Sequence, residues 1–199
     1  MSEHKQKKRM VEETANRIIA ALEGTLGTPA GKANLAHLRN SIGRPLSRTV
    51  ALWPLIYSYM PDYFLDDRGF TTYEERAILT TLGLYALHQQ GNNESVNERN
   101  KRTIGRALKA LRVEEDTQAV DRRFNALVTS ETFEELSHYL RQMIGLLRSK
   151  TEAKVDYAKL AEDLYWFQRG YRERMRLSWA RDYYRIDVKK EKEGAEDHE

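Results

Sequence analysis

The chain has 199 residues, of which 40% are hydrophobic and 32% charged, with a formal net charge of +3. This composition is typical of a folded protein of one domain or two small subdomains, and the charge is too small to indicate a nucleic-acid partner by itself. The lack of cysteine excludes disulfides and thiolate chemistry. No apolar run approaches the roughly 18 residues that span a membrane, and none follows the N-terminus as in a signal peptide. We therefore expect a cytoplasmic protein with no membrane partner.

The spacing of apolar residues predicts a series of helices in which residues three and four apart form buried faces. In chain order these helices cover residues 5–22, 35–42, 46–59, 72–91, 97–113, 120–127, 133–148, 156–167 and 171–185. Pro54 is expected to kink the third helix or to lie in an early turn of it. Capping boxes are expected before the fourth helix, at Thr71 or Thr72, and before the seventh, at Thr132, while Asp156 is the expected N-cap of the eighth.

No segment alternates with a period of two, so the predicted fold class is all-α, with about eight or nine helices. The polar stretch GNNESVNERN is the best boundary between two packed helical subdomains. We expect an N-terminal subdomain at residues 1–95 and a C-terminal bundle at 96–187. The charged residues 188–199 carry no core-forming pattern and are expected to be disordered.

The most informative stretch is NERNKRTIGRALKALRV, residues 97–113. In a helix, Arg99, Arg102, Arg106 and Lys109 lie on one face, opposite an apolar face that includes Leu108. No acid occurs between Arg99 and residue 113, whereas solvated helix faces usually mix both signs. This asymmetry favours a polyanionic partner.

A second region without acids extends from residue 24 to 61 and contains Lys32, Arg39, Arg44 and Arg48. It is either an ordinary exposed surface that lacks acids or a continuation of the basic surface at 97–113. Arg123, Arg141 and Arg148 add basic positions on later helices. Such side chains contact phosphates without reading sequence, and no helix-turn-helix, zinc-finger or RRM signature accompanies them.

Aromatic residues crowd the C-terminal part between residues 165 and 184, interleaved with arginines. They are either core residues or platforms on which bases stack. We favour core positions for Phe167 and Trp179 and leave both interpretations open for Tyr171 and Tyr184.

Catalysis is not expected. The five histidines lack metal-ligand spacing, and the adjacent acid pairs occur mainly where they complement a helix dipole. No phosphate-binding Gly-rich loop and no nucleophile elbow is present. We expect no enzyme activity, no metal, no cofactor and no small-molecule substrate.

Two pairs of stretches resemble a known family. They are TIGRALKAL followed by DRRFNALVTSETFEELSHYLRQMIGLLR, and VDYAKLAEDLYWF followed by RLSWARDYYR. They are similar to the CasB family, the small subunit of type I-E CRISPR Cascade surveillance complexes. The likeness covers roughly residues 32 to 185 and departs from the family at Asp156-Tyr157, where Asp-Trp is frequent.

This resemblance implies an all-helical, non-catalytic subunit of an antiviral complex, present in two copies beside the large and backbone subunits. Its expected partners are guide RNA and target DNA, including the displaced single strand, whose binding would stabilise the R-loop. By matching position, Arg39, Arg106, Arg123 and Arg141 fall where the family keeps basic residues that face nucleic acid. The full set of expected nucleic-acid-binding residues is Lys32, Arg39, Arg44, Arg102, Arg106, Lys109, Arg123, Arg141 and Arg148. The alternative is a helical scaffold or adaptor whose basic face binds an acidic protein.

Overall fold

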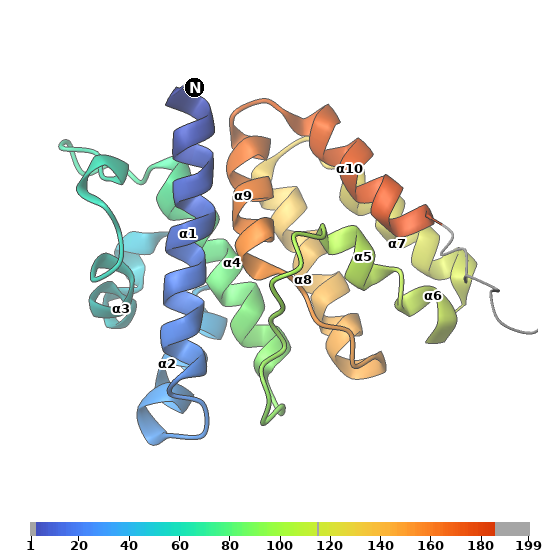
Figure 1. Ribbon diagram of the computed structural model, residues 1–199, viewed down its shortest axis with the longest axis horizontal. Helices are drawn as coiled ribbons and strands as arrows, with labels where there is room; N and C mark the ends of the chain where they lie inside the picture. The colour runs from blue at the N-terminus through green and yellow to red at the C-terminus, as the bar shows by residue number, and fades with distance from the viewer. Residues whose placement is uncertain (1–2, 115, 186–199) are drawn as a thin grey trace, which may run out of the picture.

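A computed structural model describes residues 3–114 and 116–185, and it is built from α-helices packed around a central one (Figure 1). The α-helices are α1 (Glu3–Glu23), α2 (Pro29–Ser41), α3 (Trp53–Tyr57), α4 (Tyr73–Gln89), α5 (Ile104–Leu108), α6 (Leu111–Glu114), α7 (Thr117–Val128), α8 (Phe133–Lys150), α9 (Tyr157–Gln168) and α10 (Arg172–Tyr184). Short 3-10 helices η1 (Leu46–Arg48), η2 (Val50–Leu52) and η3 (Asp62–Phe64) lie between α2 and α4. Within the described ranges there is no β-strand, only an isolated bridge between Asn97 and Val155. The all-α prediction is confirmed.

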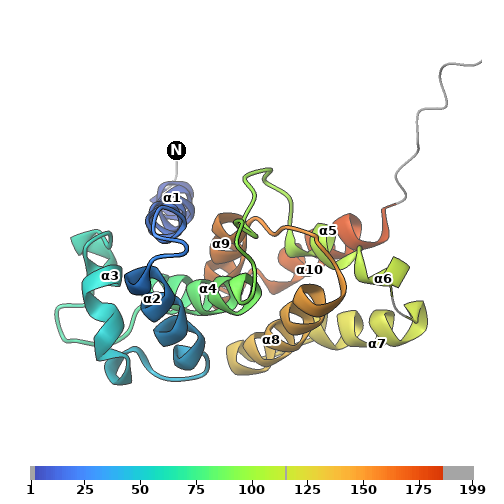
Figure 2. The ribbon, with the colours of Figure 1, turned by 90° about the horizontal axis from the view of Figure 1, so that it is seen from below.

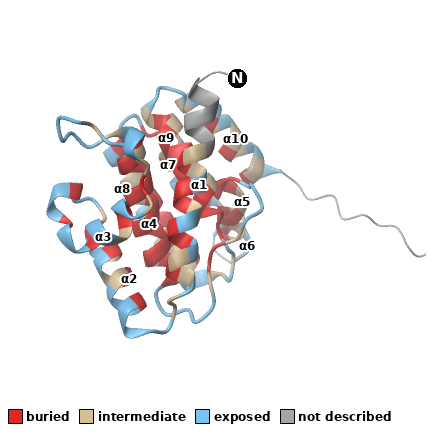
Figure 3. Ribbon diagram, turned by 60° about the vertical axis from the view of Figure 1, so that its left-hand side comes forward, coloured by how far each residue is buried: buried red, intermediate tan, exposed pale blue. Residues whose placement is uncertain are grey.

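Helix α4 is the centre of the molecule. It packs against α1, α2, α8 and α9, and most of its residues are buried, so that its ribbon in Figure 3 is red along most of its length. Its hydrophobic residues surround the helix instead of forming one stripe, as is typical of a helix enclosed by others. The positions of these four helices are therefore defined largely by their contacts with α4.

The long first helix packs on the second half of the chain. Helix α1 lies beside α9 as well as α4, and its buried residues include Val11, Ile18 and Leu22. A single cluster of buried hydrophobic residues extends from Val11 to Tyr183. The division at residues 95 and 96 into two subdomains stays a prediction, and the tail at 188–199 lies outside the described residues.

Local sequence signals predict several helices well. All six apolar residues predicted to form the stripe of α8 are buried: Phe133, Leu136, Leu140, Met143, Ile144 and Leu147. Thr72 and Glu75 form the predicted capping box of α4, and the side chains of Thr132 and Asp156 cap α8 and α9. Such caps satisfy backbone N–H groups that a helix leaves unpaired at its first turn.

The predicted helix at 46–59 is wrong over its first half. The chain forms η1 and η2 there, and only Trp53–Tyr57 is α-helical, with Pro54 in its first turn. Thr49 has a non-helical backbone (φ −117°, ψ 43°), and its hydroxyl donates to the carbonyl of Leu46 at 2.8 Å. This local hydrogen bond competes with an α-helix, as Ser and Thr hydroxyls often do.

The predicted helix at 97–113 is also wrong over its first seven residues. Residues 97–103 are not helical, and helical structure begins with α5 at Ile104. Backbone hydrogen bonds pair this segment with Val155. Glu98 N–H donates to the Val155 carbonyl, and Val155 N–H donates to the Val96 carbonyl, both at 3.0 Å. Lys101 has a positive φ of 57°, which no helix of L-residues continues. Tertiary pairing therefore replaces the helix that the spacing predicted.

The C-terminal aromatic residues belong mainly to the core. Trp179 and Phe167 are buried, which confirms the core interpretation, whereas Tyr171 and Tyr184 are 45% and 43% exposed. Trp179 donates its indole N–H to the buried carboxyl of Asp163 at 2.7 Å. Burial raises the pKa of Asp163, against the opposing effect of the nearby Lys159.

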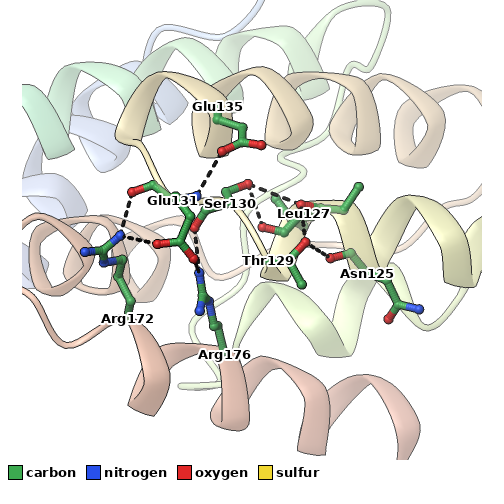
Figure 4. A network of polar contacts seen from close by, with 9 residues as sticks. Asn125, Leu127, Thr129, Ser130, Glu131, Glu135, Arg172 and Arg176 are labelled. Carbon is green, nitrogen blue, oxygen red and sulfur yellow. Dashed lines mark hydrogen bonds and ion pairs between the residues drawn. The ribbon is translucent and has the colours of Figure 1, made fainter.

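Helix α10 is fixed to the turn between α7 and α8 by one carboxylate. Figure 4 shows Arg172 and Arg176 directed at Glu131, whose two carboxylate oxygens each lie 2.7 Å from one guanidinium. Hydrogen bonding to Arg176 and its charge, followed by that of Arg172, lower the pKa of Glu131. These two arginines therefore serve the fold.

Candidate functional site

Two of the four basic residues predicted to share a helix face at 97–113 lie beside acids that are distant in sequence. Arg99 pairs with Glu23 at 3.3 Å, and Arg102 lies 3.9 Å from the carboxylate of Asp182. Lys109 donates to the backbone carbonyl of Arg185. The expectation that this stretch forms one uncompensated basic helix face is therefore wrong, because Glu23 and Asp182 come from α1 and α10.

Arg106 and Arg112 are two further basic residues of α5 and α6. Arg106 is half-buried on α5, and Arg112 pairs with Asp121 at 3.0 Å while its guanidinium lies over the rings of Tyr183 and Tyr184. The arginines and lysine here mainly join the extended segment, α5 and α6 to their neighbours.

A different group of arginines meets around a pocket. Arg44 follows α2, Arg76 is in the first turns of α4, and Arg141 is on α8. They line a cavity of about 620 Å³ together with Ser137 and His138 and with apolar residues such as Leu79. We call Arg44, Arg76 and Arg141 with this cavity the arginine pocket.

Two of these three guanidinium groups are uncompensated. Arg44 and Arg141 are exposed, and neither side chain forms a hydrogen bond or ion pair with any residue in the described ranges. Arg76 pairs with Glu134 and lies over the ring of Phe133, 4.3 Å from its centroid. The arginine pocket therefore presents net positive charge in a concave site, which is the arrangement that a phosphate or other anion requires.

The basic surface continues from the arginine pocket across α8 to α7. Arg122 and Arg123 of α7 line a second depression of about 250 Å³ with Tyr139 and Gln142 of α8. The side chains of Gln142 and His138 are hydrogen-bonded at 2.8 Å, and His138 belongs to the arginine pocket. Figure 2 shows α2, α8 and α7 along one side of the molecule, so these arginines follow one continuous side.

Three further predicted site residues lie on α2 and α8, two helices that contribute to the arginine pocket. Lys32 is exposed and Arg39 half-buried on α2, and Arg148, near the end of α8, donates to Gln90 at 2.7 Å. Helices α2 and α5 are separated in both Figure 1 and Figure 2, with α4 between them. The structure thus places Arg44, Arg123 and Arg141 around α2, α8 and α7 but leaves Arg102, Arg106 and Lys109 around α5. Of the two interpretations of the second acid-free region, a continuation of the basic surface at 97–113 is not favoured.

Across residues 3–114 and 116–185, no group of three His, Asp or Glu side chains is placed to hold a metal ion, and no helix is long and apolar enough to cross a membrane. His88 is buried, with Nδ1 3.0 Å from the hydroxyl of Tyr157. Sequence reasoning also missed Arg76, because Glu74 and Glu75 precede it and suggest a neutral helix start.

The model of the family described as CRISPR-associated protein Cse2 matches residues 34–184, which include the arginine pocket and its extension to α7. The chain belongs to the Cse2 family. Among curated protein sequences there is no match.

Solved structures of Cse2-family proteins have the same fold. CasB from Thermobifida fusca is 25% identical with a TM-score of 0.70, over 88% of this chain and 98% of that one. CasB from M. ruber is 26% identical with a TM-score of 0.66, covering 87% and 92% of the two chains. A chain of a CRISPR RNA-guided surveillance complex is 17% identical over 87% and 93%, with a TM-score of 0.68, a likeness of fold alone. The resemblance to CasB seen in the sequence is confirmed.

Proposed function

We propose that this protein is a non-catalytic subunit of an RNA-guided CRISPR surveillance complex in the cytoplasm, where it binds nucleic-acid backbone without sequence specificity and stabilises the R-loop. Membership of the Cse2 family supports a role in CRISPR defence. The observation that carries the binding role is the arginine pocket, in which Arg44 and Arg141 have no partner among the described residues. Charged groups that protein acids do not neutralise are available to phosphates.

The energetics of R-loop formation fit this kind of contact. The heteroduplex that forms is about as stable as the DNA duplex that it replaces, so modest backbone contacts shift the balance. We propose guide RNA, target DNA and its displaced strand as ligands, and the large and backbone subunits and a second copy of the chain as protein partners. From the nine expected binding residues we propose Arg44, Arg123 and Arg141 for these contacts, because their side chains pair with no residue in the described ranges.

The test uses the reconstituted guide-RNA complex with target DNA. We compare wild type with Arg44→Glu/Arg141→Glu by nuclease protection of the displaced strand and by the lifetime of the R-loop. Because the variant repels two phosphates, we expect lost protection and an R-loop lifetime shortened at least about tenfold, within the range for two charge contacts. Assembly of the complex is measured in parallel by size-exclusion chromatography.

Two results contradict the proposal. Unchanged protection with complete assembly removes this surface from nucleic-acid binding. Lost assembly, with no DNA binding by the wild-type chain alone or in the complex, supports the alternative of a scaffold that binds an acidic protein.

A further inference from the structure

The segment between α2 and α4 exposes an unusual number of aromatic and aliphatic side chains. Seven of the eleven exposed large hydrophobic residues in the described ranges lie between residues 50 and 73. Trp53, Tyr57 and Phe70, which are 38%, 39% and 66% exposed, surround a depression of about 390 Å³. We call these three residues with the depression the aromatic pocket. Exposed apolar surface of this kind indicates a binding site.

Two of the rings are held in place by their polar ends. The indole N–H of Trp53 donates to the carbonyl of Leu46 at 3.1 Å, and the hydroxyl of Tyr57 donates to Glu75 at 3.2 Å. The two rings contact each other with centroids 6.5 Å apart. A ring that is already oriented loses little entropy when a flat ligand covers its exposed face.

The aromatic pocket adjoins the arginine pocket. Leu46 and Thr71 line both cavities, and Leu46 follows Arg44 by two residues. The same Leu46 carbonyl accepts the hydrogen bond from Trp53. The guanidinium of Arg44 and the indole ring of Trp53 therefore lie on either side of Leu46, which lines both pockets.

The charges of the two pockets differ in sign. The aromatic pocket contains the carboxylates of Asp66 and Glu75, and Asp66 pairs with Arg68 at 3.2 Å. Arg68 also lies 5.4 Å from the centroid of the Phe70 ring. The acids disfavour a phosphate in the aromatic pocket, and the partly exposed carboxylate of Asp66 can accept a hydrogen bond from the amino group of a base. A ligand with a flat ring on one side and phosphates on the other matches both pockets.

We propose that the aromatic pocket stacks an unpaired base of a single-stranded nucleic acid whose backbone phosphates lie in the arginine pocket. This inference rests on the proposed function and extends it from backbone contacts to a base-stacking subsite. Stacking on aromatic rings tolerates every base, so the binding remains independent of sequence. Because bases in a duplex are already stacked on one another, the aromatic pocket selects single strands.

The experiment measures binding of the full chain to a thymidine oligonucleotide and to an abasic strand with the same number of phosphates. We expect wild type to bind the thymidine strand about tenfold more tightly, as one stacked base allows. Trp53→Ala/Phe70→Ala removes two rings, along with the hydrogen bond from Trp53 to the Leu46 carbonyl, and should abolish this preference, with unchanged salt dependence. Trp53→Phe keeps a ring and should retain most of the preference.

Tyr171→Ala/Tyr184→Ala is the matched control, because both rings are exposed to a similar degree and lie elsewhere. It should bind like wild type, and thermal melts verify that each variant is folded. Equal binding of both strands by wild type, with a normal salt dependence, overturns the stacking subsite but leaves the proposed function intact. Binding of neither strand contradicts the proposed function itself. An alanine variant that keeps its base preference but no longer joins the other subunits identifies the aromatic pocket as a protein contact and also overturns the inference.

Discussion

Arg44 and Arg102 illustrate why charge in the sequence is an incomplete guide to a binding site. Both occur in stretches without nearby acids, yet Asp182 of α10 faces Arg102, and no acid in the described ranges pairs with Arg44. Only the tertiary fold decides which positive charge stays available. Arg76 is the opposite case, because two acids precede it in the sequence and yet it lines the arginine pocket, where it pairs with Glu134.

At the same scale, buried His88 predicts a loss of stability in acid. Burial, followed by the charge of Arg148, lowers the pKa of His88 to about 4, compared with about 6.5 when the chain is unfolded. Between these values the unfolded chain binds more protons, so stability is complete above about pH 6.5 and falls as the pH drops toward 4. The difference corresponds to about 3 kcal/mol of unfolding free energy at most.

Chemical denaturation at pH 7.5 and pH 4.5 measures this effect. His88→Gln, which cannot titrate, should lose about 2 kcal/mol less than wild type over this interval. Since the raised pKa of Asp163 and of Glu12 acts in the opposite direction in both proteins, the comparison isolates the histidine. Identical pH dependence in the two proteins contradicts this assignment.

At the scale of elements, the backbones of α5 and α10 approach each other closely at Gly105. A β-carbon at this position would lie 2.1 Å from the carbonyl oxygen of Trp179, a backbone atom that no side-chain rotation removes. Gly105→Ala should therefore destabilise the protein by about 1–3 kcal/mol despite its better helix propensity. Gly145→Ala on α8 is the matched control, since nothing lies within 4 Å of its β-carbon.

Urea denaturation distinguishes the two glycine variants. Gly145→Ala should be stabilised by about 0.5–1 kcal/mol, because alanine favours a helix over glycine. If Gly105→Ala raises the free energy of unfolding as much as Gly145→Ala does, the protein does not have this close contact between α5 and α10.

The helices that the sequence predicts correctly are those whose signals are local. The stripe of α8 and the caps at Thr72, Thr132 and Asp156 depend on residues within a few positions of one another. Local signals could not show that residues 97–103 are non-helical, because Val155, Asp156 and Asp182, which are distant in sequence, hold this segment by hydrogen bonds. Asp156 and Asp182 each accept a hydrogen bond from the backbone of this segment.

At the scale of the whole molecule, two sides differ in how their cations are used. On the side of α1, α5 and α10, Arg99 and Arg102 pair with acids and join elements of the fold. On the side of α2, α8 and α7, Arg44, Arg123 and Arg141 have no side-chain partner in the described ranges. The pattern of basic residues in the sequence included these three, and the family resemblance also indicated Arg123 and Arg141, but neither could separate them from the paired ones. We infer that the second side faces nucleic acid.

The most direct measurement of this central claim is the salt dependence of single-stranded DNA binding by the full chain. Arg44→Ala/Arg141→Ala is compared with wild type and with Lys154→Ala/Arg181→Ala, which removes the same charge from two exposed residues elsewhere. Each phosphate contact contributes about 0.7 to the slope of log K against log salt, so the first variant should lose about 1.4 and bind more weakly. The control should keep the wild-type slope. Equal slopes for all three proteins, or a loss confined to the control, would contradict the assignment of the arginine pocket to nucleic acid.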